Sequence, residues 1–293
     1  MNIAFLAYAN QITGLGHWYR SITLAKHLKV SGNNVIVIGD RKPDGFKYHS
    51  AGYPFVLNNY GVFFRLLQER EIEWLIVDTP DEMPRRFYTT CRMHNIKICV
   101  LNGVGHVVGD RADLRIVQGF DDKAKYSGMD YVILRQNVFD LKAQRQEQRD
   151  FGIEPIIEWF VFGGASDKME LLRKFPNWPR FLFSVSEKEW NQSSNYDDAF
   201  LRVAAVCKWA CVGMGMTVWE LCAMRVKNWV VSPTPEHLKF ALEMDRRGLI
   251  MAWQDVGIPD PFSMRQFLQT PFEITGATPD GRACERIERL LNG

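Results

Sequence analysis

Short apolar runs of β-forming residues alternate with segments of helical periodicity, and this alternation constrains the fold more than any other feature of the chain. The sequence opens with a strand-like run at 3–7, a helical segment at about 17–30 and a second strand-like run at 34–38. This order predicts a βαβ unit, and continuous apolar runs are typical of parallel strands that helices cover on both faces. The first half is therefore predicted to be an open α/β domain.

The same alternation starts again near residue 155. Further strands are predicted at 55–57, 74–78, 96–101, 114–117, 156–162, 180–185, 207–212 and 228–232. Further helices are predicted at 62–71, 82–94 and 168–175, with a surface helix at 282–291. The stretch between the halves is polar on nearly every face. We therefore predict an N-terminal Rossmann-like domain at 1–139, a linker at 140–154 and a C-terminal Rossmann-like domain at 155–293, facing each other across a cleft.

Composition excludes several classes of protein. The 36 basic residues nearly balance the 34 acidic ones, so the net charge of +2 provides no broad positive field for a nucleic acid. The six cysteines form no CxxC pair, which favours reduced thiols, and a zinc site at Cys207, Cys211 and Cys222 would need a fourth ligand that the local sequence does not supply. No apolar run approaches the ~20 residues that span a bilayer. We expect a cytoplasmic protein without integral membrane association.

The loop between the first strand and the first helix carries the strongest candidate site. Gly14 and Gly16 permit close backbone approach, and the free N–H groups at a helix start attract anions. His17 is expected in the first helical turn, where the positive end of the helix disfavours the imidazolium and leaves the ring able to accept a proton. Arg20 lies on roughly the same face and could reach a phosphate. The alternative is a tight turn in which His17 only bonds the helix start and Arg20 is a surface charge.

This loop also imitates a dinucleotide-binding fingerprint. Gly14 and Gly16 follow a strand, and Asp40 closes the second strand. Tyr19 occupies the position of the third glycine, where a bulky ring would obstruct close packing of helix on strand. A nicotinamide or flavin site is therefore disfavoured.

Two later loops repeat the order of strand, glycine loop and helix. Their candidate ligand-binding residues are Gly164, Ala165 and Ser166 in the first of them, and Gly215, Met216, Thr217 and Glu220 in the second. Small residues let backbone N–H groups converge on a diphosphate, with Ser166 as an added donor. Glu220 is expected in the first helical turn, where its carboxylate could bind vicinal hydroxyls or merely compensate the helix dipole. Each loop taken alone is also compatible with an ordinary turn.

The first loop resembles a known signature. Gly14–Arg20 followed by Leu24 and Ala25 is similar to the G-x-G-H-x-x-R…L-A pattern of the UDP-sugar hydrolase of pseudaminic acid biosynthesis and of related GT-B glycosyltransferases. Other segments fall in matching order, at 77–78, 128–135, 163–167 and 213–220. The likeness spans most of the chain, and the segment 128–135 resembles the hydrolase more than the wider superfamily.

The resemblance implies the GT-B form of the two-domain α/β fold and a UDP-sugar in the interdomain cleft, with no metal ion and no cofactor. Gly164, Ala165 and Ser166 would then cradle the diphosphate, and Glu220 would bind the ribose hydroxyls. His17 would deprotonate the attacking group, which is water in a hydrolase and an acceptor hydroxyl in a transferase. Asp78, at the end of a strand, is a second catalytic candidate, and a capping carboxylate before Pro80 is the alternative.

The region at 235–240 departs from the family pattern. These families usually have Asn-Gln or Asp-Gln there, whereas this chain has Pro235, Glu236 and His237, and Phe240 replaces a downstream Asn. Glu236 and His237 are candidates for altered sugar specificity. They are equally compatible with an ordinary helix start after Pro235.

We expect a metal-independent glycosyltransferase that uses a nucleotide sugar, most simply a UDP-sugar, with His17 as general base. Cleavage of the anomeric C–O bond by water, as in the hydrolase, is the alternative. A silent binding protein that keeps the cleft without the chemistry is the third hypothesis. The acceptor is left open among a carbohydrate, a lipid-linked sugar, a protein side chain and a modified nucleic-acid base.

Overall fold

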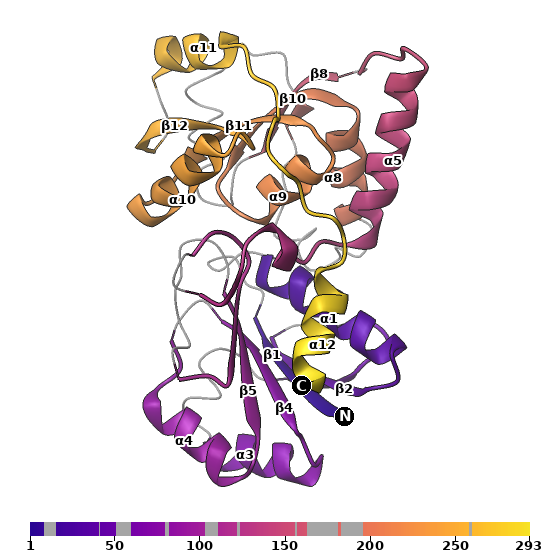
Figure 1. Ribbon diagram of the computed structural model, residues 1–293, viewed down its shortest axis with the longest axis vertical. Coiled ribbons are helices and arrows are strands. Elements are labelled where there is room, and N and C mark those ends of the chain that lie inside the picture. The colour runs from indigo at the N-terminus through magenta and orange to yellow at the C-terminus, as the bar shows by residue number, and fades with distance from the viewer. Residues whose placement is uncertain are drawn as a thin grey trace. The chain divides into compact units, whose positions relative to one another are not determined.

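The computed structural model of the protein divides into two compact units, each with its own parallel sheet (Figure 1). The first unit contains Met1–Leu134 and Gly281–Gly293, and the second contains Arg135–Asp280. The structure describes residues 1–8, 16–40, 42–50, 60–79, 82–102, 111–121, 124–155, 157–162, 181–182, 196–257 and 260–293. The α/β class with two Rossmann-like units, predicted from the alternation of strands and helices, is confirmed.

The described strands of the first unit form a seven-stranded sheet in the order β3-β2-β1-β4-β5-β6-β7, with every pair parallel. These strands are β1 (Asn2–Ala7), β2 (Asn34–Gly39), β3 (Lys47–Ser50), β4 (Trp74–Asp78), β5 (Lys97–Asn102), β6 (Leu114–Val117) and β7 (Tyr126–Ser127). The strand order reverses between β1 and β4, which are adjacent at the centre of the sheet. The carboxyl ends of two such strands flank the switch point at which open α/β sheets bind ligands.

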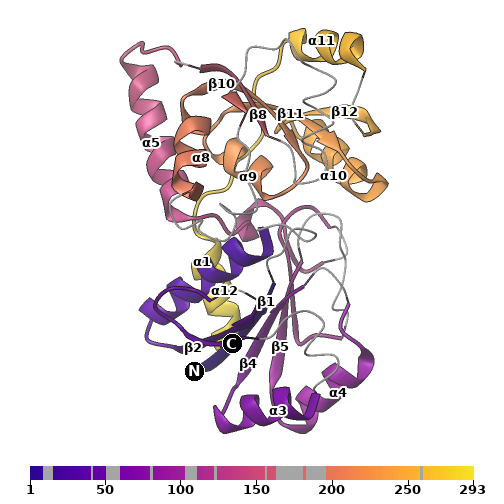
Figure 2. The ribbon, with the colours of Figure 1, turned by 180° about the vertical axis from the view of Figure 1, so that it is seen from behind.

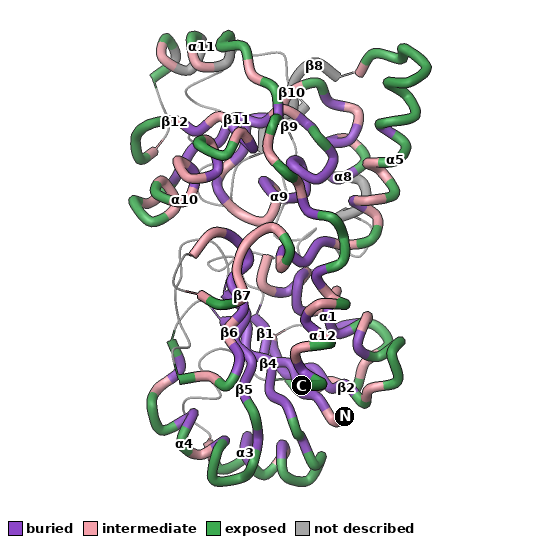
Figure 3. The backbone as a smooth tube through the Cα atoms, in the orientation of Figure 1, coloured by how far each residue is buried: buried purple, intermediate pink, exposed green. Residues whose placement is uncertain are grey.

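Helices cover both faces of this sheet because its central strands are apolar on both sides. The helices are α1 (Gly16–Val30), α3 (Tyr60–Glu69), α4 (Arg85–Met93) and α12 (Ala283–Asn292), with a 3-10 turn at Met129–Tyr131. In β1, Ile3 and Phe5 face the core beneath α1 and α12, whereas Ala4 and Leu6 face the core beneath α3 and α4. Figure 2 shows α1 and α12 side by side. The buried strands β1 and β4 lie between the two layers (Figure 3).

The described strands of the second unit form a five-stranded parallel sheet in the order β12-β11-β10-β8-β9. They are β8 (Ile157–Phe162), β9 (Phe181–Leu182), β10 (Cys207–Gly213), β11 (Lys227–Ser232) and β12 (Met251–Val256). The helices are α5 (Gln136–Asp150), α8 (Tyr196–Ala205), α9 (Met216–Ala223), α10 (Pro235–Arg246) and α11 (Pro261–Gln269). No described helix of the chain is long and apolar enough to cross a membrane.

The segment predicted as a linker at 140–154 is largely helical and belongs to the second unit. It lies mostly within α5, which packs against α8 and α9. Arg145 is buried in this contact, and its Nη1 donates to the carbonyl of Ala205 at a distance of 2.6 Å. Val138 and Arg145 are the buried residues of α5. The linker interpretation is wrong because this segment is mostly a packed helix of the second unit. The sequence did not indicate it, because a helix that buries one apolar side chain and one arginine has no apolar periodicity.

The last helix also differs from its prediction. A surface helix at 282–291 in the C-terminal domain was expected, whereas α12 belongs to the first unit. Ile287 and Leu291 are buried in the core that α12 shares with α1, and Trp74 Nε1 donates to the carbonyl of Leu291 at 3.1 Å. The predicted helical spacing of apolar residues was right, but it says nothing about which sheet the helix covers. The strand predicted at 55–57 and the helix predicted at 168–175 lie outside the described residues.

Candidate functional site

The structure brings His17 and Asp78 together at the switch point of the first sheet. Asp78 is the last residue of β4 and pairs in register with Ala7, the last residue of β1. The chain returns from β1 into α1, which starts at Gly16 and places His17 in its first turn as predicted. His17 Nδ1 lies 2.6 Å from Asp78 Oδ1. The two candidates that the sequence offered separately therefore form one dyad.

Arg20 and Ser21 complete a cluster around the carboxylate of Asp78. They follow His17 by three and four positions, so all three side chains share one face of α1. Arg20 Nε donates to Asp78 Oδ2 at 2.7 Å, and Arg20 Nη2 contacts Oδ1. Ser21 Oγ donates to Oδ2 at 2.8 Å. Asp78, which is 0% exposed, thus accepts bonds on both oxygens.

The charges of the cluster keep the carboxyl group of Asp78 ionised. Burial alone would raise the pKa of this carboxyl. The charge of the Arg20 guanidinium, together with His17 and the hydrogen bonds from both side chains, outweighs burial and holds the pKa below its usual value of 3.8. Asp78 is therefore a carboxylate at neutral pH, able to hold a donor proton of the His17 ring.

The placement of Arg20 excludes one of the two interpretations of the sequence. Arg20 is 3% exposed, so it is not a surface charge. Its guanidinium contacts the carboxylate of Asp78, and phosphate binding by Arg20 stays a prediction. Side chains of three residues of α1, His17, Arg20 and Ser21, contact this carboxylate. Gly16 is the first residue of α1, and Gly14 lies outside the described residues.

A second arginine and carboxylate pair lies in the second unit, between Arg135 and Glu220. Arg135 is the N-cap residue of α5, and its Nη2 and Nε lie 2.7 and 3.2 Å from Glu220 Oε1. Glu220 is buried on α9. It was expected in the first turn of that helix, but Gly215 is the N-cap and α9 begins at Met216, so Glu220 stands in the second turn. Its contact with Arg135 accounts for the buried charge better than the helix dipole does.

The start of α9 supplies the remaining predicted residues of the third glycine loop. Gly215, Met216 and Thr217 are partly exposed there, after the carboxyl end of β10. The first few N–H groups of a helix lack intrahelical partners, so this position suits an anion. The predicted diphosphate-binding residues Gly164, Ala165 and Ser166 lie outside the described residues.

Glu236 and His237 lie in the first turn of α10, as expected for the helix start that the sequence analysis gave as one interpretation of these residues. Thr234 is the N-cap residue and Pro235 follows it at the first helical position. The His237 backbone N–H donates to Thr234 Oγ1 at 3.4 Å, and the same oxygen lies 2.9 Å from His237 Nδ1. Glu236 is exposed in the first turn. Both residues therefore have a structural reason to be there, beside any role in sugar recognition.

Ser21 and Arg135 belong to the site region but were not predicted as site residues. The signal for Ser21 was its spacing, because position i+4 of a helix shares a face with His17. Arg135 ends the segment 128–135, but no spacing in the sequence relates it to Glu220 across 85 positions. A contact of that range depends on tertiary packing.

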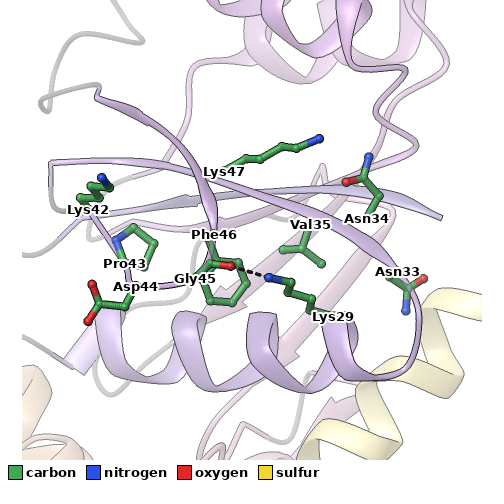
Figure 4. Close-up of a pocket in the computed structure, with 10 residues that line it drawn as sticks. All are labelled: Lys29, Asn33, Asn34, Val35, Lys42, Pro43, Asp44, Gly45, Phe46 and Lys47. Atoms are coloured by element: carbon green, nitrogen blue, oxygen red, sulfur yellow. Dashed lines mark hydrogen bonds between the residues drawn. The ribbon is translucent and has the colours of Figure 1, made fainter.

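A surface hollow in the first unit contains none of these residues (Figure 4). It is lined by the end of α1 and by the connection from β2 to β3, including Lys29, Lys42 and Lys47. Lys29 Nζ donates to the carbonyl of Gly45, and the ammonium groups in Figure 4 do not converge on one point. Lys29 is twelve residues beyond His17 on α1, roughly 18 Å along the axis. The hollow is therefore separate from the dyad.

Metal-ligating side chains do not gather in the described part of the chain. Within those residues, no group of three or more His, Cys, Asp and Glu side chains could hold a metal ion. The cysteines at 91, 99, 207, 211 and 222 are buried there as free thiols, and burial raises the pKa of each.

Comparison with known proteins finds similar folds but no close relative. No protein-family model and no curated protein sequence matches the chain. Among solved structures, the chain is similar to the UDP-GlcNAc 2-epimerase of Methanocaldococcus jannaschii in complex with UDP-GlcNAc and UDP, with 11% identity and a TM-score of 0.63 over 100% of this chain and 99% of the other. The UDP-GlcNAc 2-epimerase of Neisseria meningitidis bound to UDP-GlcNAc matches with 11% identity and a TM-score of 0.62, over all of both chains. The spinosyn forosaminyltransferase SpnP matches with 11% identity and a TM-score of 0.59, also over all of both. At these identities the likeness establishes the fold alone.

Proposed function

We propose that this protein is a UDP-sugar-dependent glycosyltransferase that needs no metal ion and uses His17 as its general base. The observation that carries the proposal is the contact of 2.6 Å between His17 Nδ1 and the buried carboxylate of Asp78, at the switch point of the first sheet. A histidine whose Nδ1–H is donated to a carboxylate carries its basic lone pair on Nε2. That is the arrangement required to take a proton from a hydroxyl group.

In the proposed transfer step, one proton moves to His17, one bond forms at the anomeric carbon and one bond to that carbon breaks. His17 Nε2 takes the proton of the acceptor hydroxyl while the acceptor oxygen forms a bond to the anomeric carbon. The bond from that carbon to the diphosphate oxygen breaks, and its electron pair leaves with UDP. N–H groups of the glycine loop at 163–167 and of the start of α9 would stabilise the charge that develops on the diphosphate.

The choice of a UDP-sugar rests on the fold and on Glu220. Two of the similar structures are UDP-GlcNAc 2-epimerases with UDP-GlcNAc bound, and another is a glycosyltransferase. In the second unit, Arg135 bonds to Oε1 of Glu220 and holds the side chain in place. Its other oxygen, Oε2, is then the acceptor we assign to the ribose hydroxyls. Gly164, Ala165 and Ser166 are assigned to the diphosphate, as the resemblance implies.

Hydrolysis of a UDP-sugar is the second candidate, and the same dyad favours it. A base that deprotonates a hydroxyl can also deprotonate water, and the segment Gly14–Arg20 resembles the hydrolase as well as the transferases. Transfer is preferred because Pro235, Glu236 and His237 replace the polar residues that the hydrolase family has near the sugar. The acceptor is proposed only as a hydroxyl compound.

One assay separates these functions. The purified protein is incubated with a panel of UDP-sugars, with and without candidate acceptors, and UDP release and sugar products are followed by NMR. Release that depends on an acceptor supports transfer, and release with water alone supports hydrolysis. Saturable binding with no turnover for any donor would contradict both and leave a binding protein.

The role of His17 is tested with a matched pair of variants. His17→Ala should reduce turnover by about 10²- to 10⁴-fold while UDP binding changes little. His27→Ala is the control, because His27 lies on the same helix and its Nε2 contacts a carboxylate, Glu288, at 2.8 Å. Equal turnover in the two variants would exclude His17 as the base.

A further inference from the structure

Three atoms of the cluster around Asp78 lie close together, namely His17 Nδ1, Asp78 Oδ1 and Arg20 Nη2. They cannot all be hydrogen-bonded to one another. His17 Nδ1 lies 2.6 Å from Asp78 Oδ1 and 2.8 Å from Arg20 Nη2, which itself contacts Oδ1. A guanidinium nitrogen can only donate. His17 Nδ1 must therefore either donate to Asp78 or accept from Arg20.

The carboxylate decides between these two states. If Nδ1 accepted from Arg20, its lone pair would face an ionised oxygen at 2.6 Å, which is repulsive. If Nδ1 carries the proton, it donates a charge-assisted bond to Asp78 Oδ1. The contact of 2.8 Å with Arg20 is then a close approach between two nitrogens that both bear hydrogen, rather than a hydrogen bond. Arg20 consequently places a positive charge directly beside the imidazole.

That charge opposes the effect of Asp78 on the ring. A carboxylate beside a histidine stabilises the imidazolium, and a protonated ring cannot act as a base. A guanidinium at the same distance destabilises the imidazolium. Among the described residues, Asp78 of β4 and Arg20 of α1 are charged groups that contact the ring. Cys99 on β5 lies near Asp78, and burial raises the pKa of its thiol so that it stays neutral.

We propose that Arg20 is a positioning residue that keeps His17 neutral, by cancelling the charge of Asp78 while holding its carboxylate toward Nδ1. Two bonds from Arg20, from Nε to Oδ2 and from Nη2 to Oδ1, fix the plane of the carboxylate. Asp78 thereby selects the ring tautomer, and Arg20 prevents the same carboxylate from trapping the proton. Arg20 does not bind the diphosphate of the donor. This inference rests on the proposed function only in that His17 acts as a base.

The test measures the ring itself and needs no turnover. The ¹⁵N shifts of His17 are followed by NMR against pH in the wild-type protein and in Arg20→Gln and Arg20→Lys variants. In the wild type, the neutral ring should be protonated on Nδ1. Arg20→Gln should raise the pH at which the ring takes up its second proton by about one unit or more, because Asp78 is then uncompensated. Arg20→Lys keeps the positive charge and should restore most of the wild-type behaviour.

A double variant covers the case in which Arg20→Gln does not fold. Arg20→Gln combined with Asp78→Asn removes both charges, so its protonation midpoint should return toward that of the wild type. An unchanged midpoint in Arg20→Gln, or a double variant with a midpoint raised by about one unit, would overturn the proposal.

Binding of UDP gives an independent readout. A loss of about tenfold or more in UDP affinity in Arg20→Lys would contradict the statement that Arg20 does not bind the diphosphate, and an unchanged affinity is expected. If no UDP-sugar is turned over, the proposed function fails while the NMR result still decides the role of Arg20.

Discussion

Each unit of the molecule contains a buried carboxylate that an arginine contacts, Asp78 in the first unit and Glu220 in the second, and these two pairs are built differently. In the first unit, Asp78 is 0% exposed and accepts from Arg20, Ser21 and His17 on both of its oxygens. In the second, the side chain of Glu220 is 8% exposed, and both contacts from Arg135 fall on Oε1. The bonds to Asp78 fix both oxygens of its carboxylate beside His17, whereas Arg135 contacts only Oε1 of Glu220. This difference is the basis for proposing a catalytic role for the first pair and a ligand-binding role for the second.

The strongest way to break this comparison is Asp78→Asn. We expect turnover to fall by about 10³-fold or more, because the wrong tautomer of His17 is then favoured. We also expect a loss of about 3–5 kcal/mol in the free energy of unfolding, because Arg20 would be left as a buried charge without its partner. Kinetics at saturating donor and denaturant unfolding measure the two effects. A variant with wild-type turnover would remove Asp78 from the mechanism.

The stability effect of Asp78→Asn should depend on pH. The pKa of Asp78 is lowered in the folded protein relative to its usual value of 3.8, so the unfolded chain binds the proton more tightly. The stabilisation by this carboxylate is therefore fully present above about pH 4 and is lost as the pH falls through the folded pKa. Unfolding curves of the wild type and the variant should differ at pH 7 and converge at acid pH. A gap that widens on acidification would contradict the assignment.

Glu220→Gln tests the second half of the comparison. The amide keeps the size of the side chain but weakens its bonds to ribose hydroxyls, so we expect about a tenfold loss of UDP affinity. Calorimetry with UDP and with 2′,3′-dideoxy-UDP checks the cause, because the difference between wild type and variant should vanish for the dideoxy compound. Glu243→Gln is the control, since Glu243 also pairs with arginines but lies on the surface of α10. A loss that persists with the dideoxy compound would assign Glu220 to structure alone.

The same comparison shows what sequence can and cannot predict. Five of the seven described strands of the first unit, β1, β2, β4, β5 and β6, were predicted because continuous apolar runs are local, whereas the short edge strands β3 and β7 were not. His17 was placed correctly because a helix start is also local. His17 and Asp78 were both candidates, since His17 lies at the start of the helix that follows the first strand and Asp78 ends a strand. Their contact depends on β1 and β4 being adjacent, which the sequence does not state. The pairing of Arg135 with Glu220 likewise joins two helices that are far apart in the chain.

The wrong predictions have a common physical cause. The linker prediction failed because α5 packs through Arg145, a residue that sequence patterns assign to the surface. The last helix was predicted in the wrong domain because amphipathic spacing identifies the apolar face of a helix but not the element against which that face packs. Ile287 is buried against α1 rather than in the second unit. Tertiary partners, not local propensities, decided both outcomes.

Arg145 gives the smallest expected effect, and it sharpens the comparison from the other side. It is buried like Arg20, but its described partner is the carbonyl of Ala205, the last residue of α8, rather than a carboxylate. Burial and the nearby charge of Arg149 lower the pKa of Arg145 to about 10, so the protein disfavours this cation. Replacing such a group with an apolar side chain of similar length removes a desolvation penalty together with one hydrogen bond. We therefore expect Arg145→Met to change the free energy of unfolding by less than about 1 kcal/mol, with UDP binding and turnover unchanged.

Arg20→Met is the matched variant, and it should cost about 3 kcal/mol or more, because it leaves the Asp78 carboxylate buried without its counter-charge. Equal losses in the two variants, measured by denaturant unfolding, would mean that the carboxylate partner does not distinguish the two arginines.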